Sequence, residues 1–175
     1  MLTLTRIKEI ESYEYNFTEQ LLTTSFPINE YRDLHKQQEN TRLENSFHLL
    51  IAKENGKPIG FISYWSFEDF CYVEHFAIDS KLRNRGYGKA IMKELQKQQP
   101  TIVLEVEMPE NELAERRINF YRRLGFVLCE KSYAQPPYRR EYKELPMMLM
   151  SCNCNMEENF DKVKQLIHRK VYGIF

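Results

Sequence analysis

The sequence lacks an excess of charge of either sign, because 25 lysines and arginines balance 25 aspartates and glutamates. Proteins held on nucleic acid by bulk electrostatics carry a basic excess, so we expect no nucleic-acid partner. No apolar run approaches the about 20 residues that cross a bilayer. The first residues, MLTLTRIKEIESYEYN, show no basic segment followed by an apolar one, as a secretory signal would. We therefore expect no membrane partner and a cytoplasmic location.

Cysteine is scarce and is not arranged for metal binding. The four cysteines are Cys71, Cys129, Cys152 and Cys154. Cys152 and Cys154 form a C-x-C pair, but no histidine or second cysteine pair stands at a zinc-like spacing beside them. Without a secretory signal, the expectation is reduced thiols and no metal.

The sequence does contain enough apolar material for one folded core. Its 175 residues are 42% hydrophobic, 13% aromatic and 29% charged, which is typical of a soluble globular protein of about one domain. Repeats, low-complexity tracts and a convincing linker are absent. We predict one domain over residues 1–151 and a helical extension over residues 152–175.

Hydrophobic periodicity and turn signals predict a mixed order of elements. Strands are predicted at 2–8, 47–53, 58–65, 71–79, 101–107, 126–133 and 146–151, and helices at 13–25, 30–43, 86–98, 112–124 and 157–172. Asn55-Gly56 is a strong hairpin signal. The last helix carries Phe160, Val163, Ile167 and Val171 on one face. The sequence leaves open whether this face packs on its own domain or on a second subunit of a homodimer.

The stretch Arg83-Asn84-Arg85-Gly86-Tyr87-Gly88-Lys89 is the one most suggestive of ligand binding. It lies between a predicted strand and a predicted helix. Glycines let the backbone approach a ligand closely, and the free N–H groups and macrodipole of a helix start attract anions. Arginines and a lysine add positive charge. The pattern is neither a Walker A loop nor a dinucleotide turn, and alone it fits a phosphate site or an ordinary basic loop equally well.

Three segments in sequence order resemble the GNAT superfamily of N-acetyltransferases: HFAIDSKLRNRGYGKAIMKEL, VLEVE and RRINFYRRLGF. The resemblance covers residues 47–150 and is most specific over residues 74–126. It implies an α/β (α+β) fold, with a mixed twisted sheet of about six to seven strands flanked by helices. Here an additional C-terminal helix follows. The resemblance also implies that acetyl-CoA, as co-substrate, lies where the sheet splays at its centre.

The resemblance assigns residues to acetyl-CoA. Phe76, Ala77 and Ile78 match the strand whose backbone pairs with the pantetheine arm. The family's loop that wraps the CoA pyrophosphate matches Arg83, Asn84, Arg85, Gly86, Tyr87 and Gly88, and Lys89 adds charge beside it. Backbone donors and arginines are suited to a dianion. The sequence departs from the family at Ala114, where many members carry an asparagine that helps hold CoA, and Asn111 is nearby but out of register.

Tyr121 matches the tyrosine of the family's Y-x-x-x-G-F motif, which donates a proton to the leaving CoA sulfur. A phenol is a competent donor to a departing thiolate. The alternative is that Tyr121 only packs in the core, because Ala114, Ile118 and Gly125 follow the same helical stripe.

Two carboxylates and a histidine compete for the role of general base. Glu105 lies in Leu104-Glu105-Val106, which resembles the segment of the ribosomal-protein alanine N-acetyltransferases whose glutamate is the base. It also interrupts an apolar strand, which calls for a reason. Glu74, just before Phe76, is the rival. His75 or a bound water remains a further alternative.

The expected function is N-acetyl transfer from acetyl-CoA to a primary amine, by direct attack through a tetrahedral intermediate. Two alternatives remain: an acyltransferase that uses a longer acyl-CoA, and a non-catalytic acetyl-CoA-binding or interaction module. The amine acceptor is not identified by the sequence. In this fold, residues 26–43 and 134–144 would shape its site.

Overall fold

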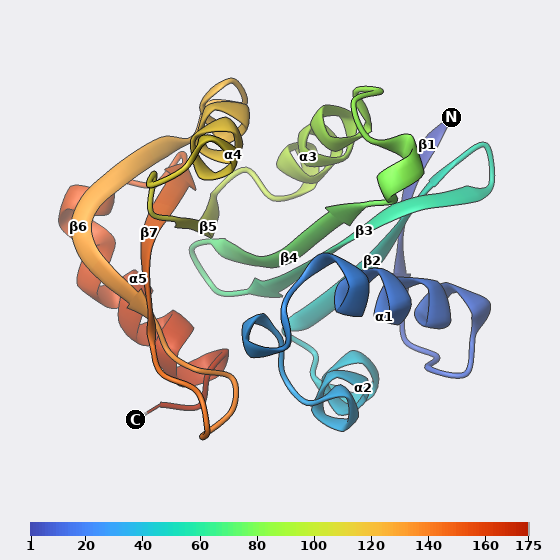
Figure 1. Cartoon of the computed structure of the whole chain (residues 1–175), viewed down its shortest axis with the longest axis horizontal. Helices are drawn as coiled ribbons and strands as arrows, with labels where there is room; N and C mark the ends of the chain where they lie inside the picture. The colour runs from blue at the N-terminus through green and yellow to red at the C-terminus, as the bar shows by residue number, and fades with distance from the viewer. Residues whose placement is uncertain (175) are drawn as a thin grey trace.

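Within residues 1–174, which the computed structural model describes, a seven-stranded sheet organises the molecule (Figure 1). The strands are β1 (Leu2–Ile7), β2 (Phe47–Glu54), β3 (Lys57–Ser66), β4 (Cys71–Ile78), β5 (Ile102–Glu107), β6 (Val127–Gln135) and β7 (Leu145–Cys152). Their order is β1-β2-β3-β4-β5-β7-β6. Neighbouring strands are antiparallel except β4 and β5, which run parallel. The mixed sheet confirms the predicted α/β architecture.

Helices cover both faces of this sheet. They are α1 (Tyr13–Ser25), α2 (Leu34–Leu43), α3 (Tyr87–Gln98), α4 (Glu112–Arg122) and α5 (Met156–Lys170). α3 and α4 lie on one face, and α1, α2 and α5 lie on the other (Figure 1). Two buried apolar clusters follow from this layering, one joining the strands to α1 and α5 and the other joining them to α3 and α4. Among residues 1–174, no helix is both long enough and apolar enough to cross a membrane.

The hydrophobic face predicted for the last helix packs within the chain itself. Phe160, Val163, Ile167 and Val171 are all buried, in the same cluster as residues of the sheet and α1. The additional C-terminal helix therefore forms as predicted. It covers the sheet on the side of β6 (Figure 1).

The helix predicted at residues 30–43 begins later than expected. The structure has a short 3-10 turn, η1 (Ile28–Glu30), and α2 begins at Leu34. Asp33 caps α2 by accepting a hydrogen bond from the His35 N–H at 2.9 Å. Tyr31 and Arg32 are buried in the connection between turn and helix. The prediction was wrong here because tertiary burial of these two side chains outweighs local helix propensity.

The sheet divides between β4 and β5, and this division positions the site. The two strands pair only at Cys71↔Ile102, Tyr72↔Val103 and Val73↔Leu104. Just beyond them, Ser63 of β3 pairs with His75 while Tyr64 pairs with Val73. Glu74 is therefore the extra residue of a β-bulge, and a bulge re-aims the side chains beside it. Glu74 and Glu105 are the first residues of their strands beyond the paired segment.

Candidate active site

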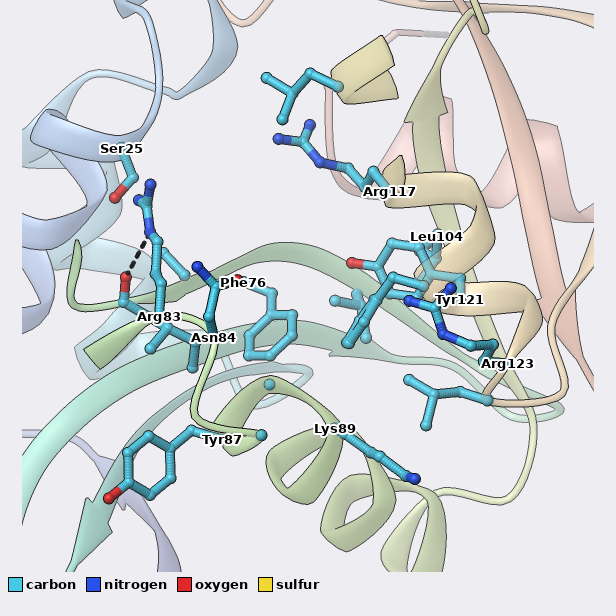
Figure 2. Close-up of a pocket in the computed structure, with 18 of the residues that line it drawn as sticks. Ser25, Phe76, Arg83, Asn84, Tyr87, Lys89, Leu104, Arg117, Tyr121 and Arg123 are labelled. Atoms are coloured by element: carbon cyan, nitrogen blue, oxygen red, sulfur yellow. Dashed lines mark hydrogen bonds between the residues drawn. The ribbon is translucent and has the colours of Figure 1, made fainter. Parts of the chain in front are cut away.

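A cleft of about 780 Å³ opens where β4 and β5 diverge. Figure 2 shows its walls, with residues of β4, the loop before α3 and the start of α3 on one side and residues of α4 on the other. Leu104 of β5 lines it where the two strands part. Most of the residues that line the cleft thus come from the three segments that carried the sequence resemblance.

The start of α3 presents backbone donors to this cleft. Gly86 is the N-cap with φ +81°, and no side chain caps the helix. The first hydrogen bond within α3 is donated by the Ala90 N–H to the Gly86 carbonyl, at 3.1 Å. The N–H groups of the preceding residues, 87 to 89, are therefore available to an anion. A Cβ added at Gly88 would lie 3.5 Å from the Phe120 ring and 3.8 Å from the Phe76 ring, so it would enter the cleft.

Positive side chains surround these donors. Arg83, Lys89, Arg117 and Arg123 all line the cleft. The Arg83 Nε donates to the Ile78 carbonyl at 3.4 Å, which ties the loop to the end of β4 (Figure 2). Arg85, in contrast, is exposed and is not among the residues that line the cleft. The chemistry of the donor set fits a phosphorylated ligand.

The edge of β4 offers further backbone groups. Phe76, Ala77 and Ile78 line the cleft. On one edge they pair with β3, while β5 has already moved away on the other. The N–H and C=O groups on that second edge face the opening rather than a neighbouring strand. An extended ligand with amide groups could complete the ladder there.

Tyr121 reaches from α4 into the middle of the cleft (Figure 2). Its ring contacts Phe120 and Phe126 edge-to-face, with centroids at 5.1 and 5.4 Å. Burial raises the pKa of Tyr121 to about 12, with a small opposing effect from Arg117. The hydroxyl is consequently protonated throughout the physiological range. Tyr121 therefore packs in the core and lines the cleft as well.

Glu105 is surrounded by hydroxyl and amide donors. The Tyr133 hydroxyl donates to its Oε1, and the Gln135 Nε2 donates to its Oε2 at 2.6 Å. The Tyr172 hydroxyl lies 2.9 Å from Oε2 and 3.1 Å from Oε1. Burial raises the pKa of Glu105, and these hydrogen bonds offset the rise only in part. Glu105 is thus a partly buried carboxylate, and among residues 1–174 no cation is paired to it.

Glu74 has the opposite environment. It forms an ion pair with Arg32, and both side chains are almost fully buried. Trp65 Nε1 donates to its Oε2 at 3.0 Å, and the Tyr138 hydroxyl donates to its Oε1 at 2.9 Å. Burial alone would raise the pKa of Glu74, but the Arg32 guanidinium and the hydrogen bond from Trp65 hold it below its usual value.

His75, the third candidate base, is buried and lies against the connection between α1 and α2. Its Nε2 is 2.8 Å from the Glu30 carbonyl oxygen, and its Nδ1 has no hydrogen-bond partner within the described chain. Burial lowers the pKa of His75, although the neighbouring Glu74 opposes this. The lowered pKa favours the neutral ring, which is held by backbone rather than by a cleft residue.

Several contributing residues were not singled out from the sequence. Arg117 precedes Tyr121 by four residues, a spacing that places both on one face of α4. Tyr172 was only a member of the predicted C-terminal helix. Asn111, noted as out of register, caps α4 by accepting from the Ala114 N–H at 2.9 Å. The helix spacing could have identified Arg117, whereas no local signal points from Tyr172 to Glu105.

Comparisons with known proteins agree with this geometry. The sequence pattern of the acetyltransferase (GNAT) family matches residues 13–126. The chain belongs to this family. It is a GNAT acetyltransferase, and the resemblance drawn from its sequence motifs is confirmed.

Solved structures and a curated relative support the assignment. A protein from Bacteroides thetaiotaomicron, described as a GNAT-family acetyltransferase, is 44% identical with a TM-score of 0.96 and 99% coverage of both chains. A GNAT acetyltransferase from Elizabethkingia anophelis, with acetyl-CoA bound, has a TM-score of 0.58 at 16% identity and covers 87% of this chain and 98% of its own. Peptidyl-lysine N-acetyltransferase YiaC of Escherichia coli (strain K12) is 30% identical over 101 residues, or 58% of this chain and 60% of YiaC. The match to YiaC thus spans less than two thirds of that relative.

Proposed function

We propose that this GNAT acetyltransferase transfers the acetyl group of acetyl-CoA to a primary amine, with Glu105 as general base and Tyr121 as general acid. The observation that carries the proposal is the cleft between β4 and β5, which both residues line together with the start of α3. When bound, acetyl-CoA supplies the thioester that the amine attacks. The residues that would hold it are the uncapped start of α3, the cations around it and the unpaired edge of β4.

Counting hydrogen bonds favours Glu105 over Glu74 as the base. A carboxylate has about four lone-pair sites. Glu74 receives two donors from Arg32, one from Trp65 and one from Tyr138, so its sites are filled. Glu105 receives donors from three side chains. Glu105 therefore keeps capacity to accept a proton, and its raised pKa makes it the stronger base.

The value of a base depends on the amine. A lysine of pKa about 10.4 costs roughly 4.6 kcal/mol to deprotonate at pH 7, whereas an α-amine of pKa about 8 costs about 1.4 kcal/mol. Glu105 would accept the proton released as the amine attacks, and Tyr121 would donate one to the departing sulfur. The raised pKa of Tyr121 keeps that proton in place until it is needed.

Glu105→Gln tests the assignment of the base. Thiol release from acetyl-CoA would be followed between pH 6 and 9 with three acceptors. They are a peptide with a free lysine side chain and a blocked N-terminus, a peptide with only a free α-amine, and spermidine. We expect kcat to fall by about 10²-fold or more and the acidic limb of its pH profile to disappear. High pH should partly rescue the variant, and the loss should be larger for the lysine peptide than for the α-amine.

Glu74→Gln is the matched control. It removes the charge from the other carboxylate at the same depth and leaves Glu105 untouched. We expect the acidic limb to persist, although the melting temperature should fall because Arg32 loses its ion-pair partner. A pH-rescuable loss in Glu74→Gln alone would move the role of base to Glu74.

The same assay separates the two alternative functions. Tight acetyl-CoA binding without thiol release for any acceptor would favour the non-catalytic module, and release only with longer acyl-CoAs would favour the acyltransferase.

A further inference from the structure

The donors around Glu105 lie outside the segment that defines the family. Tyr133 and Gln135 stand near the end of β6, and Tyr172 follows α5. The match to the family ends at residue 126. The family segment therefore includes Glu105 but none of the three side chains that hold its carboxylate.

The Tyr172 hydroxyl has partners that fix the direction of each hydrogen bond. It accepts from the Gln135 Nε2 at 2.9 Å and lies 3.1 Å from the Tyr72 hydroxyl. A tyrosine hydroxyl carries one proton. With that proton directed to the Glu105 carboxylate, the Tyr72 hydroxyl must donate to Tyr172. Tyr172 thus stands between a buried phenol and the carboxylate.

Packing of α5 holds Tyr172 in this place. Ile167 is fully buried, and the N–H of Val171 donates to its carbonyl at 2.9 Å. The Tyr172 ring lies 4.8 Å from the Tyr138 ring, centroid to centroid. The last turn of the helix is therefore anchored just before Tyr172, the ring packs on Tyr138, and the hydroxyl points toward Glu105 on β5.

We propose that Tyr172 is a positioning residue for the general base: its hydroxyl fixes the orientation of the Glu105 carboxylate and stabilises the carboxylate anion. The inference rests on the proposed role of Glu105. The C-terminal helix would then contribute to acetyl transfer through Glu105, although it lies outside the segment that defines the family.

The groups that face Glu105 come from several elements. They are Tyr72 of β4, Tyr133 of β6, Tyr138 of the β6–β7 loop and Tyr172, which follows α5. Beyond them, the ion-paired Glu74 accepts a hydrogen bond from Tyr138, and the centroid of the His168 ring on α5 is 5.5 Å from that of Tyr133. Burial raises the pKa of the four tyrosines, so they stay protonated between pH 5 and 9. Burial and the nearby Lys164 lower the pKa of His168. Because this imidazole is a second titratable group near these tyrosines, the readout must report on the Glu105 carboxyl itself.

Tyr172→Phe keeps the ring and removes the hydroxyl. Carbon-13 NMR of the glutamate carboxyl groups, with Glu105→Gln to assign the resonance, would follow the titration of Glu105 in the full chain without any acceptor. We expect the pKa of Glu105 to rise by about one unit, because a donor that stabilises the anion is lost. Tyr15→Phe is the matched control, since it removes another buried phenol that donates to a glutamate, Glu19, at 2.8 Å. It should leave the Glu105 titration unchanged.

Kinetics provides the second readout. We take the acceptor on which the wild type is most active among the three amines named above. For this acceptor, the acidic limb of the pH profile of kcat should move to higher pH by the same amount, about one unit, in Tyr172→Phe. Activity on that limb should fall about tenfold and recover at high pH, with the KM for acetyl-CoA unchanged. In the Glu105→Gln background, where no acidic limb is expected, Tyr172→Phe should cause no further pH-dependent loss of activity.

The outcomes separate the two proposals. An unshifted Glu105 titration in a folded Tyr172→Phe protein overturns the role of Tyr172 and leaves the base assignment standing. Loss of the base assignment would appear instead as an unchanged acidic limb in Glu105→Gln. If Tyr172→Phe does not fold, 3-fluorotyrosine at position 172 replaces it. This stronger donor should lower the pKa of Glu105, and no change would again overturn the inference.

Discussion

Two glutamates at corresponding places on neighbouring strands show how environment divides chemical roles. Glu74 and Glu105 each follow the last paired residue of β4 and β5. Arg32 neutralises the first, whereas three uncharged donors hold the second. Their pKa values consequently move in opposite directions, downward for Glu74 and upward for Glu105. Such divergence between neighbouring titratable groups is a common mark of an active site.

Tyr121→Phe tests the proton donor. The ring contacts with Phe120 and Phe126 remain, so the variant should fold. We expect kcat to fall at least about tenfold while the affinity for acetyl-CoA, measured by calorimetric titration, stays nearly the same. Because burial raises the pKa of Tyr121 to about 12, its ionisation should produce no basic limb below about pH 10 in the wild type. Full activity in the variant would return Tyr121 to a packing role alone.

At the level of elements, the start of α3 is where glycine matters most. Gly86 has a positive φ, and Gly88 keeps side-chain atoms away from the unbonded N–H groups at the start of the helix. A β-carbon at Gly88 meets only ordinary contacts within the protein, so the chain itself does not require glycine there. This makes the position a sensitive test of ligand binding.

Replacing both Gly86 and Gly88 with valine should abolish stabilisation by acetyl-CoA. A ligand that binds only the folded protein raises its melting temperature by mass action. The double variant should lose that rise because its side chains block the backbone donors. Gly56→Ala is the control for backbone strain, since Gly56 has a similar positive φ of 79° and also has open space around it. Gly56→Ala should lower the melting temperature of the free protein and keep the rise in melting temperature caused by acetyl-CoA. If calorimetry shows unchanged acetyl-CoA binding in the double valine variant, the support for this binding site is removed.

Elements defined by local chemistry were predictable from the sequence, and those defined by long-range contacts were not. α1 begins and ends as predicted, because Ser12 caps it and Pro27 follows it. The Asn55-Gly56 turn has both residues at positive φ, as its hairpin signal indicated. The late start of α2 depends on Arg32 reaching Glu74, 42 residues away in the chain. The contact of Tyr172 with Glu105 spans 67 residues and has no local signature.

On the scale of the whole molecule, Arg32 joins the α1–α2 connection to the centre of the sheet. Its guanidinium donates to Glu74 on β4 and to Gln37 on α2, at 2.8 Å for the latter. The rings of Phe47, Trp65 and Tyr138 lie within 5.6 Å of it. One buried cation thus connects α2, β2, β3 and the β6–β7 loop with Glu74 at the edge of the cleft.

Arg32→Met should destabilise the protein strongly at neutral pH. Removing one partner of a buried ion pair costs about 3–5 kcal/mol, because the other charge is left uncompensated. Since Arg32 lowers the pKa of Glu74, this stability is present above the ordinary pKa of a glutamate and is lost as pH falls through the lowered value. Urea unfolding should therefore show a large difference from wild type at pH 7 that narrows toward pH 4.

The surface ion pair of Lys97 and Glu94 supplies the comparison for Arg32. Lys97 is 72% exposed, so Lys97→Met should leave the unfolding midpoint nearly unchanged. An equal effect of the two substitutions, or a difference that does not depend on pH, would contradict the role given to the buried pair.

The division between β4 and β5 leaves the hydrogen-bond pairing of the sheet incomplete at its centre. Three residue pairs connect its four-stranded half to its three-stranded half. Beyond them, the backbone groups on the edge of β4 that faces β5 pair with no strand among residues 1–174. A bound molecule whose amides paired with these groups would act as a temporary strand, so that occupying the cleft and completing the sheet would be one event. Release would then require breaking these backbone hydrogen bonds as well as diffusion out of the cleft. The residence time of the ligand would therefore depend on the stability of the sheet.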